Sequence, residues 1–468
     1  MDATTLAFAG AAEQARLIRD GEVTSREVVE ATLARIATIE PVINAYRVVL
    51  AERALAEADQ ADGRRGAGNS RPLLGVPVAI KDDVDVAGEP TAWGTAAHAG
   101  PVARDAEVIR RLRAAGAIIV GKTLVPEMTM LPSTDTTTFG SARNPWDLGR
   151  TPGGSSGGSG AAMAAGLAGV ALGSDGAGSI RTPSAWNGLF GLKPTRDRVP
   201  LAPHEDAWQG LSVSGPLARR VVDAALFLDA TVVVVDDDGV PEGGFVGAAA
   251  REPGRLRIAV STKAPPGAMP RLGREERRAV EDIAALLRGL GHEVVERDPD
   301  YPGSLWPAGL VRVMRGVGDD VAAYMPHAER LEPRTRHAAS LGRRAPASLV
   351  RWAREAEAAQ TARLARLWED VDVLLTPATN DGPYRVGVVG RWSTPVYLAR
   401  GAERLTWMPA WNITGQPAAA VPAGLDDDGL PVGVQLVGRS GEDALLLSLS
   451  AQIEAARPWI DRRPGAIA

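Results

Sequence analysis

The sequence contains no cysteine in its 468 residues, so disulfide bonds, thiolate metal ligands and a cysteine nucleophile are all excluded. Histidine is scarce as well, and none of the five has a partner at the paired spacing typical of a metal site. We therefore expect no metal ion and no cofactor, and we look for the chemistry of the chain on other side chains. The five histidines are His98, His204, His292, His327 and His337.

The chain also lacks a strong charge of either sign and a long apolar run. Its formal net charge of −5 gives no electrostatic reason to expect nucleic acid or an anionic membrane as a partner. Residues 1–5 lack a basic region followed by an apolar stretch, so no signal peptide is expected. The most apolar stretch, 160–173, is too short and too rich in glycine to cross a bilayer. We expect a soluble, cytoplasmic monomer or homodimer that acts on a small molecule.

Short β-branched runs alternate with helical segments from residue 74 onward. Runs at 76–80 and 117–120 are typical of buried strands, and residues 106–115 between them have helical periodicity. The alternation predicts an α/β fold of three layers, with helices covering both faces of a large, mixed and mostly parallel β-sheet. Further strands are expected at 256–260, 293–296, 371–376, 418–421 and 432–437, and further helices at 161–168, 221–230, 275–290, over most of 304–369, and at 442–456.

The N-terminal part is expected to be helical. Residues 11–19 have apolar side chains at helical spacing, and Thr24-Ser-Arg-Glu27 is a capping box that opens a second helix through Ile39. Pro41 is expected to end that helix, and the polar residues 57–72 are expected to form a surface loop.

The length would allow about three domains. The acidic, glycine-rich stretch 232–254 is the best linker candidate, and two lobes around one sheet are an alternative to a single domain. We favour one domain over 1–468. Its parts would be an N-terminal helical segment at 1–70, a core at 71–230, a variable, mainly helical and substrate-side region at 231–400, and C-terminal strands and a helix at 401–468 that complete the core.

Two glycine-serine turns and one lysine suggest chemistry. Serines within the turns at 153–160 and 173–179 can be approached by a substrate carbonyl, because the backbone N–H groups there are not covered by side chains. Lys81 ends the apolar run at 76–80, and a lysine on a buried strand can lose its proton because burial disfavours the ammonium. Taken singly, the first turn could be a flexible linker and the lysine a strand cap. Together the three segments indicate a serine nucleophile with a lysine base.

Two familiar motifs match and are rejected on physical grounds. Residues 116–123 fit the phosphate-binding loop pattern, but their Ala-Ile-Ile-Val centre favours a buried strand whose Lys122 starts the next loop. Residues 153–157 fit the nucleophile elbow of α/β-hydrolases, but the elbow follows a strand and 144–152 is rich in turns. No histidine stands in a context that suggests the triad partner an elbow serine needs.

The joint pattern resembles the amidase signature family of serine hydrolases, including its amidases and aryl acylamidases. Two of its serines, Ser155 and Ser179, are 24 residues apart. The resemblance is dense over 70–222, moderate over 405–455 and thin between 255 and 400. The matching segments are Gly75-Val-Pro-Val-Ala-Ile-Lys-Asp82, Asn144-Pro-Trp146, Pro152-Gly-Gly-Ser-Ser-Gly-Gly158, Gly173-Ser-Asp175, Gly178-Ser-Ile-Arg181, Pro183, Gly188-Leu-Phe-Gly-Leu-Lys-Pro-Thr195, Gly215-Pro216, Asn412-Ile-Thr-Gly-Gln-Pro-Ala418 and Gly429-Leu-Pro-Val-Gly-Val-Gln-Leu-Val-Gly438.

The resemblance implies a hydrolase that cleaves the C–N bond of non-peptide amides through an acyl-enzyme. Ser179 would be the nucleophile, Ser155 the bridging serine preceded by a cis peptide bond, and Lys81 the base. Ala177 stands where many members have glycine, and its methyl group should be tolerated unless φ is positive. The backbone amides expected to form the oxyanion hole are those of Gly176, Ala177, Gly178 and Ser179, and the residues expected to shape the site are the ion pair Asp175 and Arg181 together with Ser156.

The expected substrates are hydrophobic or aryl amides, with aryl carbamates and esters as further substrates. The residues proposed to line an apolar pocket are Met128, Met130, Leu131, Trp186, Trp208 and Trp411, together with Pro132. Each of these could instead be a core residue. Two alternatives remain, namely a glutaminase-type subunit of a tRNA-dependent amidotransferase and a scaffold without activity.

Overall fold

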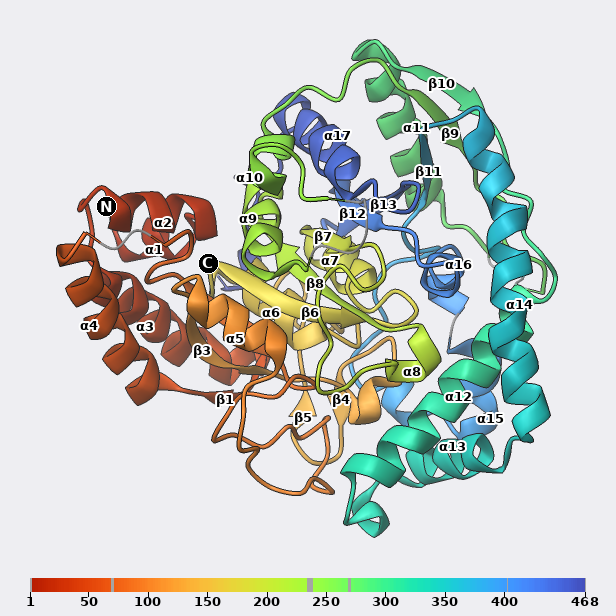
Figure 1. The fold of residues 1–468 in the computed structure, drawn as a ribbon, viewed down its shortest axis with the longest axis horizontal. Helices are drawn as coiled ribbons and strands as arrows, with labels where there is room; N and C mark the ends of the chain where they lie inside the picture. Colours follow the sequence, from red (N-terminus) through yellow and green to blue (C-terminus); the bar gives the residue numbers. More distant parts are fainter. Residues whose placement is uncertain (1, 69–70, 234–238, 268–270, 402, 468) are drawn as a thin grey trace.

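The computed structural model describes residues 2–68, 71–233, 239–267, 271–401 and 403–467, and its centre is one large β-sheet (Figure 1). Eleven of the described strands form this sheet in the order β1-β3-β2-β6-β8-β7-β12-β13-β11-β9-β10, and β4 pairs with β5 apart from it. The strands are β1 Tyr46–Val49, β2 Pro77–Lys81, β3 Ile118–Thr123, β4 Asp135–Thr136, β5 Gly140–Ser141, β6 Val170–Asp175, β7 Phe190–Lys193, β8 Val213–Ala218, β9 Arg257–Val260, β10 Glu293–Glu296, β11 Val373–Pro377, β12 Ala418–Leu425 and β13 Pro431–Val437.

The sheet is mixed. β2 lies between two parallel neighbours, β3 and β6, and β9 lies between the parallel strands β10 and β11. The other described junctions are antiparallel, including the hairpin β12–β13. Antiparallel pairing is thus more frequent than the strand–helix alternation predicts. Of these junctions, β12–β13 is a hairpin without a crossover helix between its strands.

Helices cover both faces of the sheet, as expected for a three-layer α/β fold (Figure 1). One face is covered by α5, α9, α10, α11 and α17, and the other by α3, α4 and α6. The helices are α1 Ala3–Ala7, α2 Ala11–Arg19, α3 Ser25–Ile43, α4 Ala51–Gly66, α5 Glu107–Ala114, α6 Gly157–Ala164, α7 Arg181–Asn187, α8 Ala207–Gly210, α9 Val221–Thr231, α10 Gly244–Ala249, α11 Arg274–Gly289, α12 Leu305–Tyr324, α13 Pro333–Arg344, α14 Ala347–Ala365, α15 Thr394–Arg400, α16 Pro409–Ile413 and α17 Asp443–Ala456.

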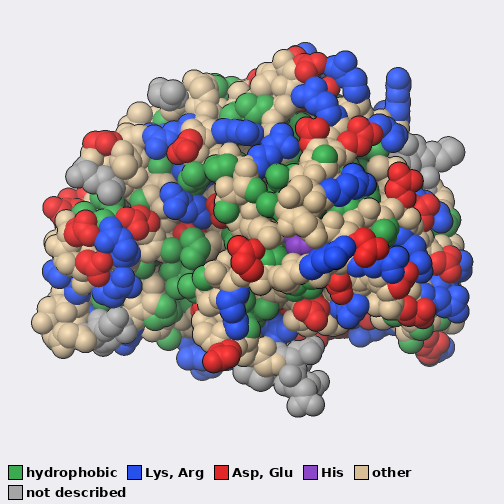
Figure 2. All heavy atoms as spheres, turned by 90° about the horizontal axis from the view of Figure 1, so that it is seen from above, with side chains coloured by type: hydrophobic (Ala, Val, Ile, Leu, Met, Phe, Trp, Pro, Cys, Tyr) green, Lys and Arg blue, Asp and Glu red, His purple; other side chains and the backbone are tan. Residues whose placement is uncertain are grey.

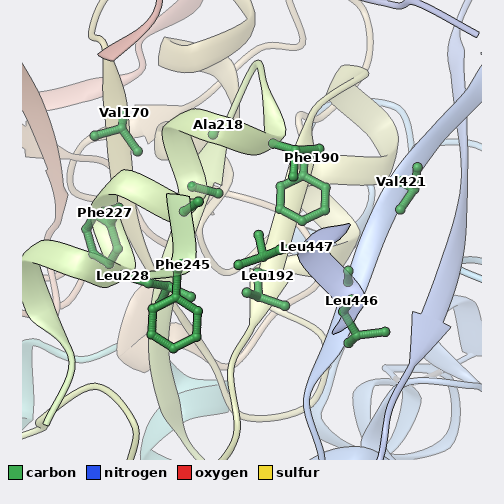
Figure 3. Close-up of a cluster of buried hydrophobic side chains, with 14 of the residues drawn as sticks. Val170, Phe190, Leu192, Ala218, Phe227, Leu228, Phe245, Val421, Leu446 and Leu447 are labelled. Carbon is green, nitrogen blue, oxygen red and sulfur yellow. The ribbon is translucent and has the colours of Figure 1, made fainter. Parts of the chain in front are cut away.

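The main hydrophobic core lies between the sheet and the helices of the first face. Phe190 and Leu192 of β7 pack there with Phe227 of α9, Phe245 of α10 and Leu446 of α17 (Figure 3). All five side chains are buried. Residues from β7 to α17 therefore stabilise one another across more than half of the chain length, which positions the strand ends that carry the site.

Two expectations for the N-terminal part are wrong. Most of 57–72 belongs to α4 and not to a loop, because Ala54, Ala58 and Ala61 fall on one helix face and pack into the core while the polar residues point outward. Pro41 does not end its helix: it lies in the last turn of α3, which continues to the buried Ile43 and ends at the left-handed Asn44. The capping box at Thr24 is confirmed.

Two further segments differ from the expectation. α6 begins at Gly157, four residues earlier than expected, and ends at Ala164. The linker candidate 232–254 contains α10, whose Phe245 is buried in the main core, so this part is packed and not a free connection. Residues 234–238 of that stretch lie outside the described residues.

The rejected phosphate-loop motif is confirmed as a strand, since residues 118–123 form β3. Lys122 does not start the next loop: it lies within β3, is fully buried, and forms an ion pair with Asp82 at 2.9 Å. None of the described helices is long and apolar enough to cross a bilayer. On the face of the molecule seen in Figure 2, basic and acidic side chains are interspersed.

Candidate active site

Lys81, the last residue of β2, lies in a buried hydrogen-bond network. Its Nζ donates to Ser155 Oγ at 2.8 Å, to Ser174 Oγ at 2.7 Å and to the Ser174 carbonyl oxygen at 3.2 Å. The side chain is fully buried. Burial lowers the pKa of Lys81, because the opposing influence of the Asp83 and Asp175 carboxylates is the smaller effect. The structure thus places the expected base against the expected bridging serine.

Asp83 and Ser174 are the two members of this network that the sequence analysis missed. Asp83 Oδ2 lies 3.3 Å from Lys81 Nζ and accepts a hydrogen bond from Ser174 Oγ at 2.5 Å. Both side chains are buried. Both lie inside or next to motifs that carry the resemblance, two residues after the lysine and one residue before Asp175. Their position beside the motif residues was therefore the only signal available.

The first serine turn has no strand before it, and residues 151–153 have no regular structure, in agreement with the rejection of a nucleophile elbow. The peptide bond between Gly154 and Ser155 is cis, as the resemblance implies. A Cβ at Gly154 would lie 2.4 Å from the Leu131 carbonyl oxygen, so the turn requires glycine there. Ser156 ties the two turns together, because its N–H donates to the Ser179 carbonyl oxygen at 3.2 Å and its Oγ to the Ser174 carbonyl oxygen at 3.1 Å.

Ser179 ends the second turn, between β6 and α7. Its side chain is 9% exposed and faces the cavity described below. Gly178 donates its N–H to Asp175 Oδ1 at 2.6 Å, so this amide is already bonded and does not fit the four-amide oxyanion hole expected. The amides of Gly176, Ala177 and Ser179 have no acceptor among the described residues. Ala177 is not among the positive-φ residues, so its methyl group is compatible with the turn.

The predicted ion pair of Asp175 and Arg181 is present and fixes the shape of this turn. Arg181 Nη2 lies 2.8 Å from Asp175 Oδ1, and both side chains are fully buried. Asp175 also accepts from the Ile180 N–H at 3.1 Å and from Asn412 Nδ2 at 2.9 Å. Burial alone would raise the pKa of Asp175, but the Arg181 charge and these hydrogen bonds hold it well below its usual range. Asn412 comes from α16, so the C-terminal part completes the site.

A cavity of about 800 Å³ opens onto the two serine turns. Gly154, Gly176, Ala177 and Ser179 of the two turns are among the residues that line it. Of the predicted pocket residues, Met130, Leu131, Pro132 and Trp208 line it. The rest of the wall is largely apolar and comes from α12, α15, α16 and the segments around them: Thr129, Leu211, Pro265, Pro266, Gly267, Gly303, Leu305, Trp306, Pro307, Gly309, Leu310, Val313, Tyr397, Arg400, Gly401, Glu403, Leu405, Thr406, Pro409, Ala410 and Ile413.

Three predicted pocket residues lie elsewhere. Met128, Trp186 and Trp411 are fully buried in the hydrophobic core and are not part of the cavity wall. The Trp411 ring packs on Tyr301 and Trp368. Sequence position alone could not separate them from wall residues, because large apolar side chains occur in both environments. Residues 265–267 of the wall lie within the region 231–400 that was expected on the substrate side, but none of them was named individually.

Charged groups are scarce in the wall. Arg400 and Glu403 form an ion pair at 3.0 Å, and both are exposed, so they belong to the rim. Among the described residues, no three His, Asp or Glu side chains are grouped so that they could hold a metal ion.

Comparison with known proteins agrees with this arrangement. The sequence profile of the family described as Amidase matches residues 27–447. The chain is 55% identical over 464 residues to a Mycobacterium tuberculosis protein named "Putative amidase AmiB2", covering 99% of both chains. Its fold matches 6-aminohexanoate cyclic dimer hydrolase with a TM-score of 0.89 and 31% identity, over 99% of this chain and 100% of the other. It also matches a bacterial aryl acylamidase with a TM-score of 0.86 and 26% identity, over 96% of both chains. The chain belongs to the amidase signature family.

Proposed function

We propose that this amidase hydrolyses hydrophobic and aryl amides through a serine nucleophile, Ser179, with Ser155 and Lys81 as its proton-transfer partners. The observation that supports this most strongly is the buried contact between Lys81 Nζ and Ser155 Oγ at 2.8 Å. Ser155 directly follows Gly154, which lines the same cavity as Ser179. A serine hydroxyl is a weak nucleophile until a neighbouring base accepts its proton. The lowered pKa of Lys81 supports that role, since only the neutral amine can act as a base.

The proposed reaction has two halves. In the first, Ser179 Oγ attacks the amide carbonyl carbon while its proton moves to Ser155 and the Ser155 proton moves to Lys81. The C–N bond then breaks, and the proton returns through Ser155 to the leaving nitrogen, which leaves an acyl-enzyme. In the second half, water attacks the ester and gives up its proton along the same path, and Ser179 is regenerated with release of the carboxylic acid.

The negative charge on the tetrahedral intermediate would be stabilised by backbone amides of the second turn. We assign this role to the amides of Gly176, Ala177 and Ser179, and leave out Gly178, whose N–H is bonded to Asp175. One such donor contributes about 2.7–4 kcal/mol to the transition state in other hydrolases.

The cavity favours apolar substrates. Its wall is built from Met130, Leu131, Trp208, Leu305 and other apolar side chains, with its ion pair at the rim. Such a wall would bury an alkyl or aryl group and offers little to the polar ends of glutamine. The same reaction would cleave aryl carbamates and aryl esters, because their leaving groups depart more readily than an amine. A glutaminase-type subunit of an amidotransferase is the less favoured alternative.

The test is release of p-nitroaniline from acyl p-nitroanilides by the purified chain alone. We expect turnover with butyryl or longer acyl groups, and loss of both turnover and fluorophosphonate labelling in Ser179→Ala. Lys81→Ala should lower both by orders of magnitude while circular dichroism stays unchanged. Activity that requires a second protein, or near-full activity of Lys81→Ala at pH 8, would refute the proposal. Glutamine hydrolysis at a higher kcat/KM than the anilides would favour the alternative.

A further inference from the structure

Lys81 has partners on two sides, and the proposed reaction uses only one of them. On one side is Ser155, which directly follows the cavity-lining Gly154. On the other side Nζ contacts Ser174 Oγ at 2.7 Å and Asp83 Oδ2 at 3.3 Å. A lysine base that needs to be neutral therefore stands beside a carboxylate, which favours its charged form.

Ser174 connects the two groups. Its Oγ accepts from Lys81 Nζ and donates to Asp83 Oδ2 at 2.5 Å, so one hydroxyl fixes both the amine and the carboxylate. The backbone of Ser174 is held in β6, and Asp83 follows β2, the parallel neighbour of β6. The contact therefore depends on the register of two central strands and is defined by the sheet itself.

Asp83 does not line the substrate cavity. It lines a separate small cavity of about 40 Å³, together with Ser174, His204 and Asp320. Thr129 and Trp208 line both cavities and so form the wall between them. Asp83 Oδ1 faces no hydrogen-bond partner among the described residues. The cavity is largely apolar, but its volume is large enough for one water molecule next to that oxygen.

Few other charges face this pair. Asp175, from the end of β6, acts on Lys81 in the same direction as Asp83 but more weakly. Across the small cavity, Asp320 of α12 and His204 face Asp83. Lys122, a buried lysine of the neighbouring strand β3, forms its own ion pair with Asp82. Asp83 is thus the nearest charge to Lys81.

We propose that Asp83, acting through Ser174, positions Lys81 and delays its deprotonation, and so sets the pH above which the enzyme is active. Asp83 is a positioning residue in this scheme, since it touches neither the substrate nor the reacting atoms. This inference rests on the proposed function, in which Lys81 is the base.

The test compares pH profiles of kcat/KM for three substitutions at one position. Asp83→Asn keeps the size of the side chain and removes its charge. We expect the acid limb of its pH profile, where activity rises as Lys81 loses its proton, to move to lower pH by about one to three units. Asp83→Glu keeps the charge, so its limb should stay within about half a unit of the parent, even if the plateau falls. Asp83→Ser, neutral and smaller, carries the same expectation as Asp83→Asn and replaces it if that variant does not fold.

Asp85→Asn is the matched control. Asp85 is a buried carboxylate of the same loop, but it accepts from Thr91 at 2.6 Å and faces His204 instead of Lys81. The acid limb of the Asp85→Asn profile should not move by more than about half a pH unit. A uniform loss of activity in Asp83→Asn with an unmoved limb, or an equal shift in Asp85→Asn, would overturn the inference.

The activity of Lys81→Ala separates the failure of the Asp83 role from the failure of the proposed lysine base. If Lys81→Ala is inactive and the limb of Asp83→Asn is unmoved, only the role of Asp83 fails. If Lys81→Ala keeps its activity, the proposed lysine base fails, whatever the Asp83 variants show.

Discussion

Replacing Asp175 by asparagine should damage both the stability and the activity of this amidase. Asp175 and Arg181 are fully buried, and the carboxylate binds the guanidinium through both of its oxygens. The same carboxylate accepts the N–H groups of Gly178 and Ile180. Asparagine has nearly the same shape, but it replaces one acceptor oxygen by a donor and removes the charge that balances Arg181.

The size of the effect follows from this geometry. Removing one partner of a buried ion pair costs about 3–5 kcal/mol, because the other charge remains buried without compensation. Arg181 keeps three further acceptors, the Met408 carbonyl oxygen, Gln435 Oε1 and Asn412 Oδ1, so we expect the lower end, about 3 kcal/mol. The turn that carries Ser179 also loses its anchors, and kcat/KM should fall by about a hundredfold or more.

Urea unfolding followed by circular dichroism measures the first effect, and p-nitroanilide hydrolysis measures the second. Asp300→Asn is the control, since Asp300 pairs with Arg363 at 2.6 Å but both side chains are about half exposed, at 48% and 46%. That exposed pair should contribute little to stability. If Asp175→Asn lost no more stability than Asp300→Asn, the argument from the buried pair would be wrong.

Three further predictions concern the turn and two buried lysines. Gly178→Ala should lower kcat/KM at least about tenfold, because φ is +124° there and a Cβ would lie 2.4 Å from Met408 Sδ. Ala177→Gly, in the same turn, should change kcat/KM little, and equal losses in the two variants would contradict this reasoning. Activity should rise with pH as Lys81 loses its proton, over a range below the ordinary pKa of lysine, since burial lowers the pKa; a rate that fell above pH 7 would exclude this. Burial lowers the pKa of Lys193 to about 7 in the folded chain. Between pH 7 and about 10.4 Lys193 therefore holds a proton in the unfolded chain but not in the folded one. In this range the free energy of unfolding should rise with pH by at most about 1.4 kcal/mol per pH unit. Lys193→Met should remove that part of the slope in urea titrations at several pH values, and an unchanged slope would show that Lys193 is charged in the folded chain.

Local sequence patterns predicted the parts of the fold whose signals are local. The capping box at Thr24 and the buried strand ending in Lys81 are confirmed, and the same composition argument identified β3 against a phosphate-loop motif. The loop expected at 57–72 is a helix, because polar composition hid a stripe of three alanines that packs into the core. The linker expected near α10 is in part packed, because Phe245 and Ala248 of α10 are buried.

The sequence could not predict which large apolar side chains line the cavity, because the segments that carry them come together from distant parts of the chain. Half of the named large pocket residues line it, whereas Met128, Trp186 and Trp411 belong to the core. Which apolar side chain faces a cavity depends on how helices far apart in the chain pack together, and no periodicity within one segment reports it. The contribution of 265–267 has no sequence signal for the same reason.

The sequence by itself determined the chemical inventory: a chain without cysteine, two serines in glycine-rich turns, and a lysine at the end of a buried strand. Only the tertiary structure decided how these groups meet. Lys81 and Ser155 are 74 residues apart and Arg181 and Asn412 are 231 apart, yet each pair forms a hydrogen bond because the strand order of one sheet brings their segments together. Register between β2 and β6 likewise places Asp83 and Ser174 against Lys81. Such contacts depend on the relative position of strands in space, and composition and spacing along the chain do not encode that position directly.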